Sequence, residues 1–218
     1  MRELDIAERY APILYFDRLE PFLPVRVGVS VLREAGPSPS FRRTFPFSDE
    51  RLDCIVEYAI YWDFDIQHLY ELEHVWVYVA RDGSVLDAEA SFHGKYFKGL
   101  LKDRSNLEDT HVILYSQPGK HAFSPMVELF DLIPDLHSCT DEGAGAAGLI
   151  ITSPFAGAYE TGEHIDRLVR AYLQQFRFRP SMVFERYDMP KELFVPWETL
   201  RQEVPERIRS IVKRLEGR

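Results

Sequence analysis

One short segment alternates strictly between β-branched and aromatic residues, and it constrains the fold more than any other part of the chain. It spans Val75–Val79 (VWVYV) and is followed by the turn-forming pair Asp82 and Gly83. A period of two is typical of a β-strand, and Asp-Gly between two such segments is typical of a hairpin turn. Because large apolar side chains occupy both faces of this strand, we expect the sheet to be covered on both sides.

Further strand patterns follow one another at a spacing that is typical of antiparallel strands joined by hairpins. We expect strands at Leu23–Leu32, Cys54–Phe64, Glu73–Ala80, Val85–Phe92 and His111–Ser116. The segment Tyr10–Phe22 is apolar and aromatic, which suits an extended stretch packed against the sheet. The segment Arg33–Glu50 is rich in Pro, Ser and Arg and predicts an irregular loop.

From Glu163 onward the spacing of apolar residues becomes that of a helix, for which Thr161 is the predicted N-cap. The apolar stripe of this helix comprises Ile165, Leu168, Val169, Tyr172 and Phe176. A second helix is predicted from about Pro205 to Leu215, and its stripe comprises Val204, Ile208, Ile211, Val212 and Leu215. Both stripes need an apolar surface to pack on, and the sheet is the natural one.

These patterns predict an α+β, β-rich fold, in which an antiparallel β-sandwich core is covered by C-terminal helices. The core would span about residues 10–155 and the helical segment about residues 160–218. A chain of 218 residues has the length of one well-filled domain, and we expect a single domain.

Charge, hydropathy and cysteine content argue against several classes of protein. The 26 basic and 35 acidic residues give a net charge of −9 without a basic block, which argues against nucleic-acid binding. No apolar segment approaches the ~18 to 20 residues that a membrane-spanning helix needs. Cys54 and Cys139 are far apart, and Met1–Leu4 leads into a structured segment without the apolar stretch of a signal peptide. We therefore expect a cytoplasmic protein with free thiols.

Two carboxylates, Glu71 and Glu73, precede the alternating segment and share the parity of its valines. They would stand at the mouth of a buried surface, where unpaired charges are costly. A divalent metal ion, either Mg, Ca, Mn or Zn, bound by both carboxylates and His68 would compensate them. Asp65, just upstream, is a further oxygen donor. The alternative is a solvated strand edge whose carboxylates pair with arginines.

Two more histidines follow in sequence near the ends of predicted strands. His93 ends a polar row on the hairpin's second strand, and this row faces either water or the two glutamates. If it faces the glutamates, His93 is a second imidazole at the site. His121 comes after the tight turn at Pro118 and Gly119 and would be a third.

The segment from His68 to Val75, His-x-x-Glu-x-Glu-His-Val, resembles the His-x-x-Asp-Trp-Glu-His-Val motif of the necrosis- and ethylene-inducing peptide-like (NPP1-like) proteins and of the fold-related vacuolar protein sorting-associated protein sixty-two family. Tyr10–Phe16 is similar to the opening of the vacuolar-sorting type. Ser91–Gly94 resembles its Ser-x-His-Gly segment, and Tyr115–Ala122 resembles its Val-Tyr-x-x-x-Gly-Ser-His-Ala segment. The resemblance covers about residues 10–125 in the same order.

The resemblance implies a β-sandwich with a divalent metal site near the surface, in which His68, Glu71 and Glu73 match the family's histidine, aspartate and glutamate ligands. This sequence departs from the motif at Glu71, which replaces the shorter aspartate, and at Leu72, which replaces tryptophan. A longer carboxylate binds a metal with different reach, so the metal identity is open. The secreted toxins of that group act on lipid head groups at plant membranes, and we do not extend toxicity to this chain.

Three functions remain open from the sequence. The first is a metal-binding β-sandwich protein that recognises a small polar ligand, such as an anionic or sugar head group. The second is a metal-dependent hydrolase that uses a metal-bound water, with His93 or His121 as the base. The third is a structural partner-binding protein without metal.

Overall fold

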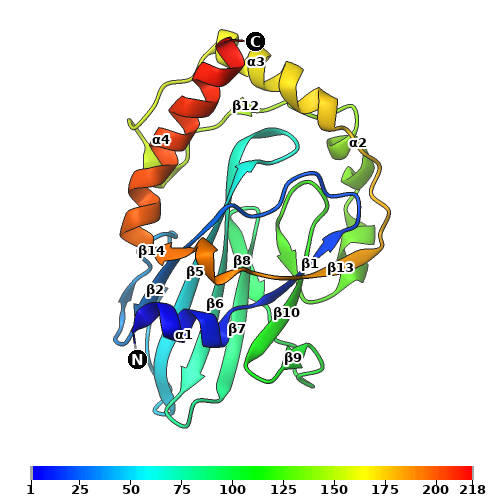
Figure 1. Ribbon diagram of the computed structural model, residues 1–218. Coiled ribbons are helices and arrows are strands. Elements are labelled where there is room, and N and C mark those ends of the chain that lie inside the picture. Colours follow the sequence, from blue (N-terminus) through cyan, green and yellow to red (C-terminus); the bar gives the residue numbers. More distant parts are fainter. Residues whose placement is uncertain (1, 218) are drawn as a thin grey trace.

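Two β-sheets pack face to face in the computed structural model, which describes residues 2–217 (Figure 1). The larger sheet has the strand order β14-β2-β5-β6-β7-β8, with β12 beside β6. Its strands are β2 (Arg26–Leu32), β5 (Leu52–Phe64), β6 (His68–Ala80), β7 (Val85–Phe92), β8 (Lys95–Lys98), β12 (Gly148–Leu149) and β14 (Phe194–Pro196). The predicted hairpin is present, since β6 pairs antiparallel with both β5 and β7.

The smaller sheet has the order β11-β10-β1-β13, with β9 beside β10. Its strands are β1 (Ile13–Asp17), β9 (Leu107–Glu108), β10 (His111–Ser116), β11 (Phe123–Ser124) and β13 (Phe184–Asp188). The segment expected only to pack on a sheet thus supplies a strand of its own, β1. The predicted β-sandwich is confirmed, although β1 with β10, β14 with β2, and β12 with β6 pair in parallel.

The main core lies between the two sheets, and the valines of β6 point into it. Val75, Val77 and Val79 pack there with Leu14 of β1 and Leu114 of β10. A short helix, α1 (Glu3–Tyr10), closes part of this core, and its Ala7 carbonyl accepts a hydrogen bond of 2.8 Å from the Tyr58 hydroxyl.

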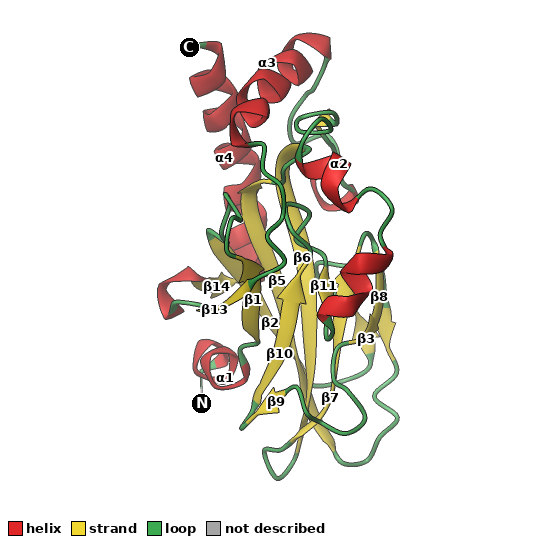
Figure 2. Ribbon diagram, turned by 90° about the vertical axis from the view of Figure 1, so that its right-hand side faces the viewer, coloured by secondary structure: helices red, strands yellow, loops and turns green. Residues whose placement is uncertain are grey.

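The opposite face of the larger sheet is covered in two places, as the apolar residues on both faces of β6 predict. The helices α3 (Glu163–Leu173) and α4 (Trp197–Glu216) gather at one end of the molecule (Figure 2). They pack on Tyr61 and Tyr70. Further along β6, Phe45 packs on Trp76, and it comes from the Arg33–Glu50 loop, which contains the two short strands β3 (Gly36–Pro37) and β4 (Thr44–Phe45).

The same loop covers the polar row of β7. Ser91 and Glu89 are buried, and the Arg43 guanidinium lies 2.6 Å from the Glu89 carboxylate. It also lies over the rings of Trp76 and Tyr96. The middle of this row therefore faces protein rather than water.

The remaining connections contain the short helix α2 (Leu136–Thr140) and short 3-10 helices. These are η1 (Val127–Leu132), η2 (Ser153–Phe155), η3 (Gln174–Phe176) and η4 (Lys191–Leu193). Cys54 and Cys139 are both free, as the sequence predicts, and both are buried. Within residues 2–217, no helix is both long and apolar enough to cross a membrane.

Two details of the helix predictions are wrong. The last helix begins at Trp197 rather than near Pro205, which lies inside it, because the buried side chains of Trp197, Leu200 and Val204 hold its first turns on the sheet. Thr161 does not cap α3. Gly162 is the N-cap residue, and the Thr161 hydroxyl instead donates a hydrogen bond of 3.2 Å to Asp166.

Candidate metal site

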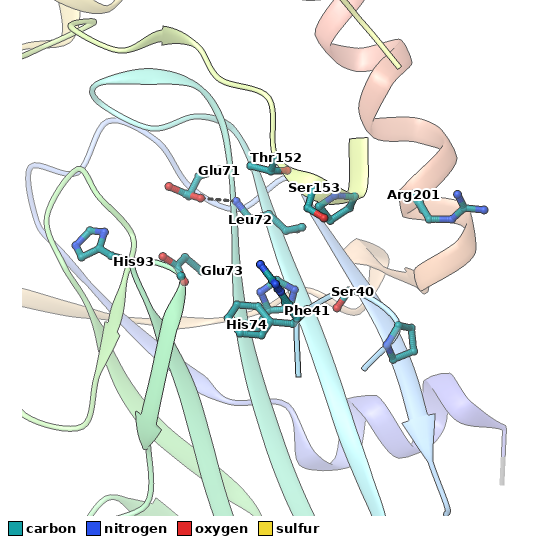
Figure 3. A pocket seen from close by; sticks show the side chains of 14 residues that line it. Ser40, Phe41, Glu71, Leu72, Glu73, His74, His93, Thr152, Ser153 and Arg201 are labelled. Carbon is teal, nitrogen blue, oxygen red and sulfur yellow. Dashed lines mark hydrogen bonds between the residues drawn. The ribbon is translucent and has the colours of Figure 1, made fainter. Parts of the chain in front are cut away.

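A left-handed residue in β6 brings His68 and Glu71 together. In a regular strand, two residues that are three positions apart point to opposite faces. Tyr70 has a φ of 54°, and this reversal ends the alternation. As a result, the Nε2 atom of His68 lies 3.5 Å from Oε2 of Glu71. The other oxygen of Glu71 accepts a hydrogen bond of 2.8 Å from the Leu72 N–H (Figure 3).

Asp65 completes a cluster of three at the turn between β5 and β6. Its backbone N–H donates to the His68 carbonyl at 3.0 Å, which fixes the turn, and its Oδ1 atom lies 3.6 Å from His68 Nε2. One ligand atom each from Asp65, His68 and Glu71 lie within 4.8 Å of one another. We call these residues the acidic trio. Asp63, two residues earlier in β5, forms an ion pair of 2.9 Å with Arg207 instead.

The hydrogen bonding of His68 fixes which of its ring nitrogens faces the two carboxylates of the trio. Its Nδ1 atom lies 2.8 Å from the Tyr70 carbonyl. A carbonyl only accepts hydrogen bonds, so Nδ1 carries the proton. In the neutral ring, the lone pair of Nε2 is then directed toward the carboxylates, which is how metal-binding histidines are usually oriented.

One oxygen of Asp65 lacks a partner. The side chain is fully buried, and Oδ2 has no hydrogen-bond partner among the described residues. Burial by itself would raise the pKa of Asp65, but the neighbouring His68, Lys120 and His121 lower it below its usual value, so the carboxylate stays ionised at neutral pH. A buried, ionised and half-satisfied carboxylate fits a metal ligand.

Lys120 is the residue that the sequence analysis missed. It lies in the turn after β10, and its ammonium is 2.7 Å from Asp65 Oδ1 and 3.5 Å from His68 Nε2. A cation therefore already pairs with the acidic trio. It is a lysine, whereas the alternative given by the sequence was pairing with arginines. Lys120 and Asp65 are 55 residues apart in the sequence, so no local pattern signals their contact.

Glu73 lies outside the trio. It is buried, and its carboxyl group accepts a hydrogen bond from the Ser91 hydroxyl. Burial, together with the negative charge of Glu71, raises its pKa to about 8. A proton therefore neutralises this carboxyl group at neutral pH, and the role of Glu73 as a metal ligand stays a prediction.

The two candidate bases occupy different environments. His93 follows β7, and its Nε2 atom lies 2.8 Å from the Gln117 side-chain oxygen. His121 is fully buried, stacks on Trp62 at 4.5 Å between ring centroids, and lies 3.3 Å from the carboxylate of Glu20.

A cavity of about 610 Å³ opens beside the trio. Glu71, Glu73 and His93 line one side of it, and Arg201 of α4 lies across from them (Figure 3). The other lining residues are Pro39, Ser40, Phe41, Arg42, Leu72, His74, Gly94, Thr152, Ser153 and Pro154. A second cavity of about 410 Å³ is lined by Gln67, Phe92, His93, Gln117, Lys120, Ile133, Asp135 and Cys139. His93 lines both cavities, whereas His121 lines neither.

No family model and no curated protein matches this sequence. Among solved structures, Necrosis and Ethylene inducing Protein 2 from the causal agent of cocoa's Witches Broom disease is similar, with 19% identity and a TM-score of 0.37 over 57% of this chain and 68% of that chain. NLPPya in complex with glucosamine is also 19% identical, with a TM-score of 0.39 over 56% of this chain and 66% of that chain. A mutant of NLPPya is 18% identical, with a TM-score of 0.38 over 55% of this chain and 64% of that chain. The predicted resemblance to this class of protein is confirmed as a distant one.

Proposed function

We propose that this protein binds a divalent metal ion through Asp65, His68 and Glu71. The observation that supports the proposal most strongly is the convergence of three donor groups around a buried, unpartnered carboxylate oxygen, Oδ2 of Asp65. His68 adds a correctly oriented lone pair. When bound, the ion would supply a positive charge that attracts an oxygen of a ligand in the adjoining cavity.

The donor set narrows the choice of metal. Carboxylate oxygens favour Mg²⁺, Ca²⁺ and Mn²⁺, whereas an imidazole favours transition metals such as Zn²⁺. Mn²⁺ accepts both kinds of donor and is therefore the most informative probe. Glu73 would become a fourth donor only after it loses the proton that burial stabilises on it.

The cavity of about 610 Å³ is the proposed binding site for a sugar or an anionic head group. Glu71 links the two functions, because it belongs to the trio and also lines this cavity. Thr152 and Ser153 offer hydroxyl groups for the hydroxyls of a sugar, and Arg42 and Arg201 offer positive charge for an anionic group.

A second candidate function, a metal-dependent hydrolase, is favoured by the position of His93. This imidazole lines the same cavity as Glu71, so it is placed to accept a proton from a water molecule there. His121 is buried outside both cavities and is less suited to this role. If the hydrolase is correct, His93→Ala should leave Mn²⁺ binding intact and reduce turnover by ~10²- to 10⁴-fold.

Metal binding is tested by titrating chelator-treated protein with Mn²⁺ in a calorimeter and by elemental analysis of the product. We expect one ion per chain in the wild type and at least ~10-fold weaker binding in Glu71→Gln, because a neutral amide replaces a charged ligand. Glu185→Gln is the matched control, since Glu185 is an exposed glutamate of β13. Unchanged Mn²⁺ affinity in Glu71→Gln would refute the site.

Two further measurements test separately whether Glu73 is a ligand and whether the cavity binds a head group. Glu73→Gln decides whether Glu73 is a ligand, because the affinity for Mn²⁺ should fall only if its carboxylate contacts the ion. Head-group binding is tested by titrating Mn²⁺-loaded protein with neutral monosaccharides and with sugar phosphates. Arg201→Ala should weaken binding of the phosphates more than that of the neutral sugars, because it removes positive charge from the cavity wall.

A further inference from the structure

The ammonium group of Lys120 occupies the Asp65–His68 edge of the acidic trio. It donates to Asp65 Oδ1 at 2.7 Å and lies 3.5 Å from His68 Nε2. The lysine side chain is only 11% exposed and the aspartate side chain is fully buried. Solvent therefore screens this ion pair weakly, and its charge affects any second cation nearby.

The two cations need the same lone pair. A metal ion lies about 2.0–2.6 Å from its nitrogen and oxygen ligands. The Nδ1 proton of His68 is committed to the Tyr70 carbonyl, so the ring has a single acceptor, Nε2. Either a hydrogen of the Lys120 ammonium or the metal ion can use that acceptor, but not both.

The net charge of the site also favours one cation at a time. With the His68 ring neutral and Lys120 in place, the carboxylates of Asp65 and Glu71 and the Lys120 ammonium sum to −1. A divalent ion in place of the ammonium makes the sum zero. A divalent ion added beside the ammonium makes it +1 in a largely buried site, where an uncompensated charge is unfavourable.

The fold offers Lys120 a second position. The cavity of about 410 Å³ is lined by Lys120 itself, and Asp135 stands in its wall. The ammonium therefore has open space beside it, in a cavity whose wall contains another carboxylate.

We propose that Lys120 is an internal counter-ion that competes with the divalent ion, so that metal uptake requires its ammonium to move from Asp65 toward the second cavity. This inference rests on the proposed metal-binding function and adds a regulatory element to the same site. Lys120 sets the affinity of the site: it offsets one of the two negative charges of the trio when metal is scarce, and it raises the concentration of metal needed for occupancy.

The test compares Mn²⁺ binding to wild type, Lys120→Met and Lys98→Met. Methionine keeps the length of the lysine stem and removes its charge. Lys98→Met is the matched control, because Lys98 forms ion pairs with Asp87 and Glu89 on an exposed part of β8. We expect Lys120→Met to bind Mn²⁺ at least ~10-fold more tightly than wild type, and Lys98→Met to bind like wild type.

The outcomes distinguish the inference from the proposed function. If wild type binds Mn²⁺ and Lys120→Met binds equally or more weakly, Lys120 positions Asp65 or has no role, and the inference is overturned while the metal site stands. If only Lys120→Met binds, the inference is supported and metal binding by the wild-type chain is refuted. If neither binds, both are overturned.

A measurement on the unaltered chain covers the case in which Lys120→Met does not fold without metal. Wild-type protein labelled with ¹³C at lysine Cε is titrated with Zn²⁺, which is diamagnetic, and the Lys120 signal is assigned with Lys120→Arg. We expect this signal to shift in proportion to the ion bound while the Lys98 signal stays fixed. Zn²⁺ binding at the site with no change in the Lys120 signal would overturn the inference.

Discussion

The imidazole of His68 meets the carboxylate of Glu71 at 3.5 Å, across a three-residue spacing that a regular strand does not allow. The left-handed backbone of Tyr70, with a φ of 54°, makes this contact possible. The His68 ring reinforces it by donating a hydrogen bond of 2.8 Å to the Tyr70 carbonyl. The proposed metal site therefore depends on one backbone conformation as well as on three side chains.

Substitutions at Tyr70 should separate the backbone contribution from that of the ring. Asparagine tolerates the left-handed region, whereas β-branched valine does not, at a cost of roughly 1–2 kcal/mol. Both substitutions remove the ring and its hydrogen bond to Thr152. Calorimetry should show at least ~10-fold weaker Mn²⁺ binding for Tyr70→Val than for Tyr70→Asn. Equal affinities in two folded variants would mean that the conformation of Tyr70 does not position His68.

Glu73 should make the metal-free protein less stable as the pH rises. Burial and the charge of Glu71 raise its pKa from 4.5 to about 8, so between these values the folded protein holds a proton that the unfolded chain releases. The free energy of unfolding then falls with pH by up to about 1.4 kcal/mol per unit. Urea unfolding in chelator should show this slope for wild type and a smaller one for Glu73→Gln. The exposed control Glu185→Gln should keep the wild-type slope.

His74 should act in the opposite direction at acid pH. Its burial between Phe41 and Trp76 lowers its pKa from 6.5 to about 3. As the pH falls through this window, the unfolded chain gains a proton that the folded protein does not, so stability falls on acidification. Between pH 7 and pH 4, His74→Phe should lose less of its free energy of unfolding than wild type does. The same smaller loss in the exposed control His164→Phe would show that His74 is not responsible.

The β-sandwich is predictable from the sequence because the residue patterns that define its central hairpin and its covering helix are local. Alternation in β6 and the Asp-Gly turn define the central hairpin, and the spacing of Ile208, Ile211 and Leu215 predicts the face of α4 that is buried. The parallel pairing of β1 with β10 is not predictable in this way. It joins segments almost a hundred residues apart, and neither segment carries a pattern that specifies its partner.

The acidic trio is predictable only in part for the same reason. His68, Glu71 and Asp65 are close in sequence, and a metal site among them can be inferred from residue type. Lys120 enters from a turn that follows a strand of the other sheet, so its contact with Asp65 depends on how the sheets pack. The contact between His68 and Glu71 depends on the left-handed backbone of Tyr70, which no residue pattern signals.

The final prediction concerns α4, which we expect to be essential for the stability of the sheet. Ile208 is fully buried, and replacing such a residue with alanine costs about 2–5 kcal/mol. The helix also lies unusually close to β2, since a Cβ atom on Gly28 would come within 2.9 Å of Leu200. Thermal unfolding should therefore show a clear loss of stability for Ile208→Ala and for Gly28→Ala. Glu206→Ala, on the exposed face of the same helix, should change the melting temperature little. A melt of Ile208→Ala indistinguishable from that of Glu206→Ala would show that α4 is dispensable for the stability of the fold.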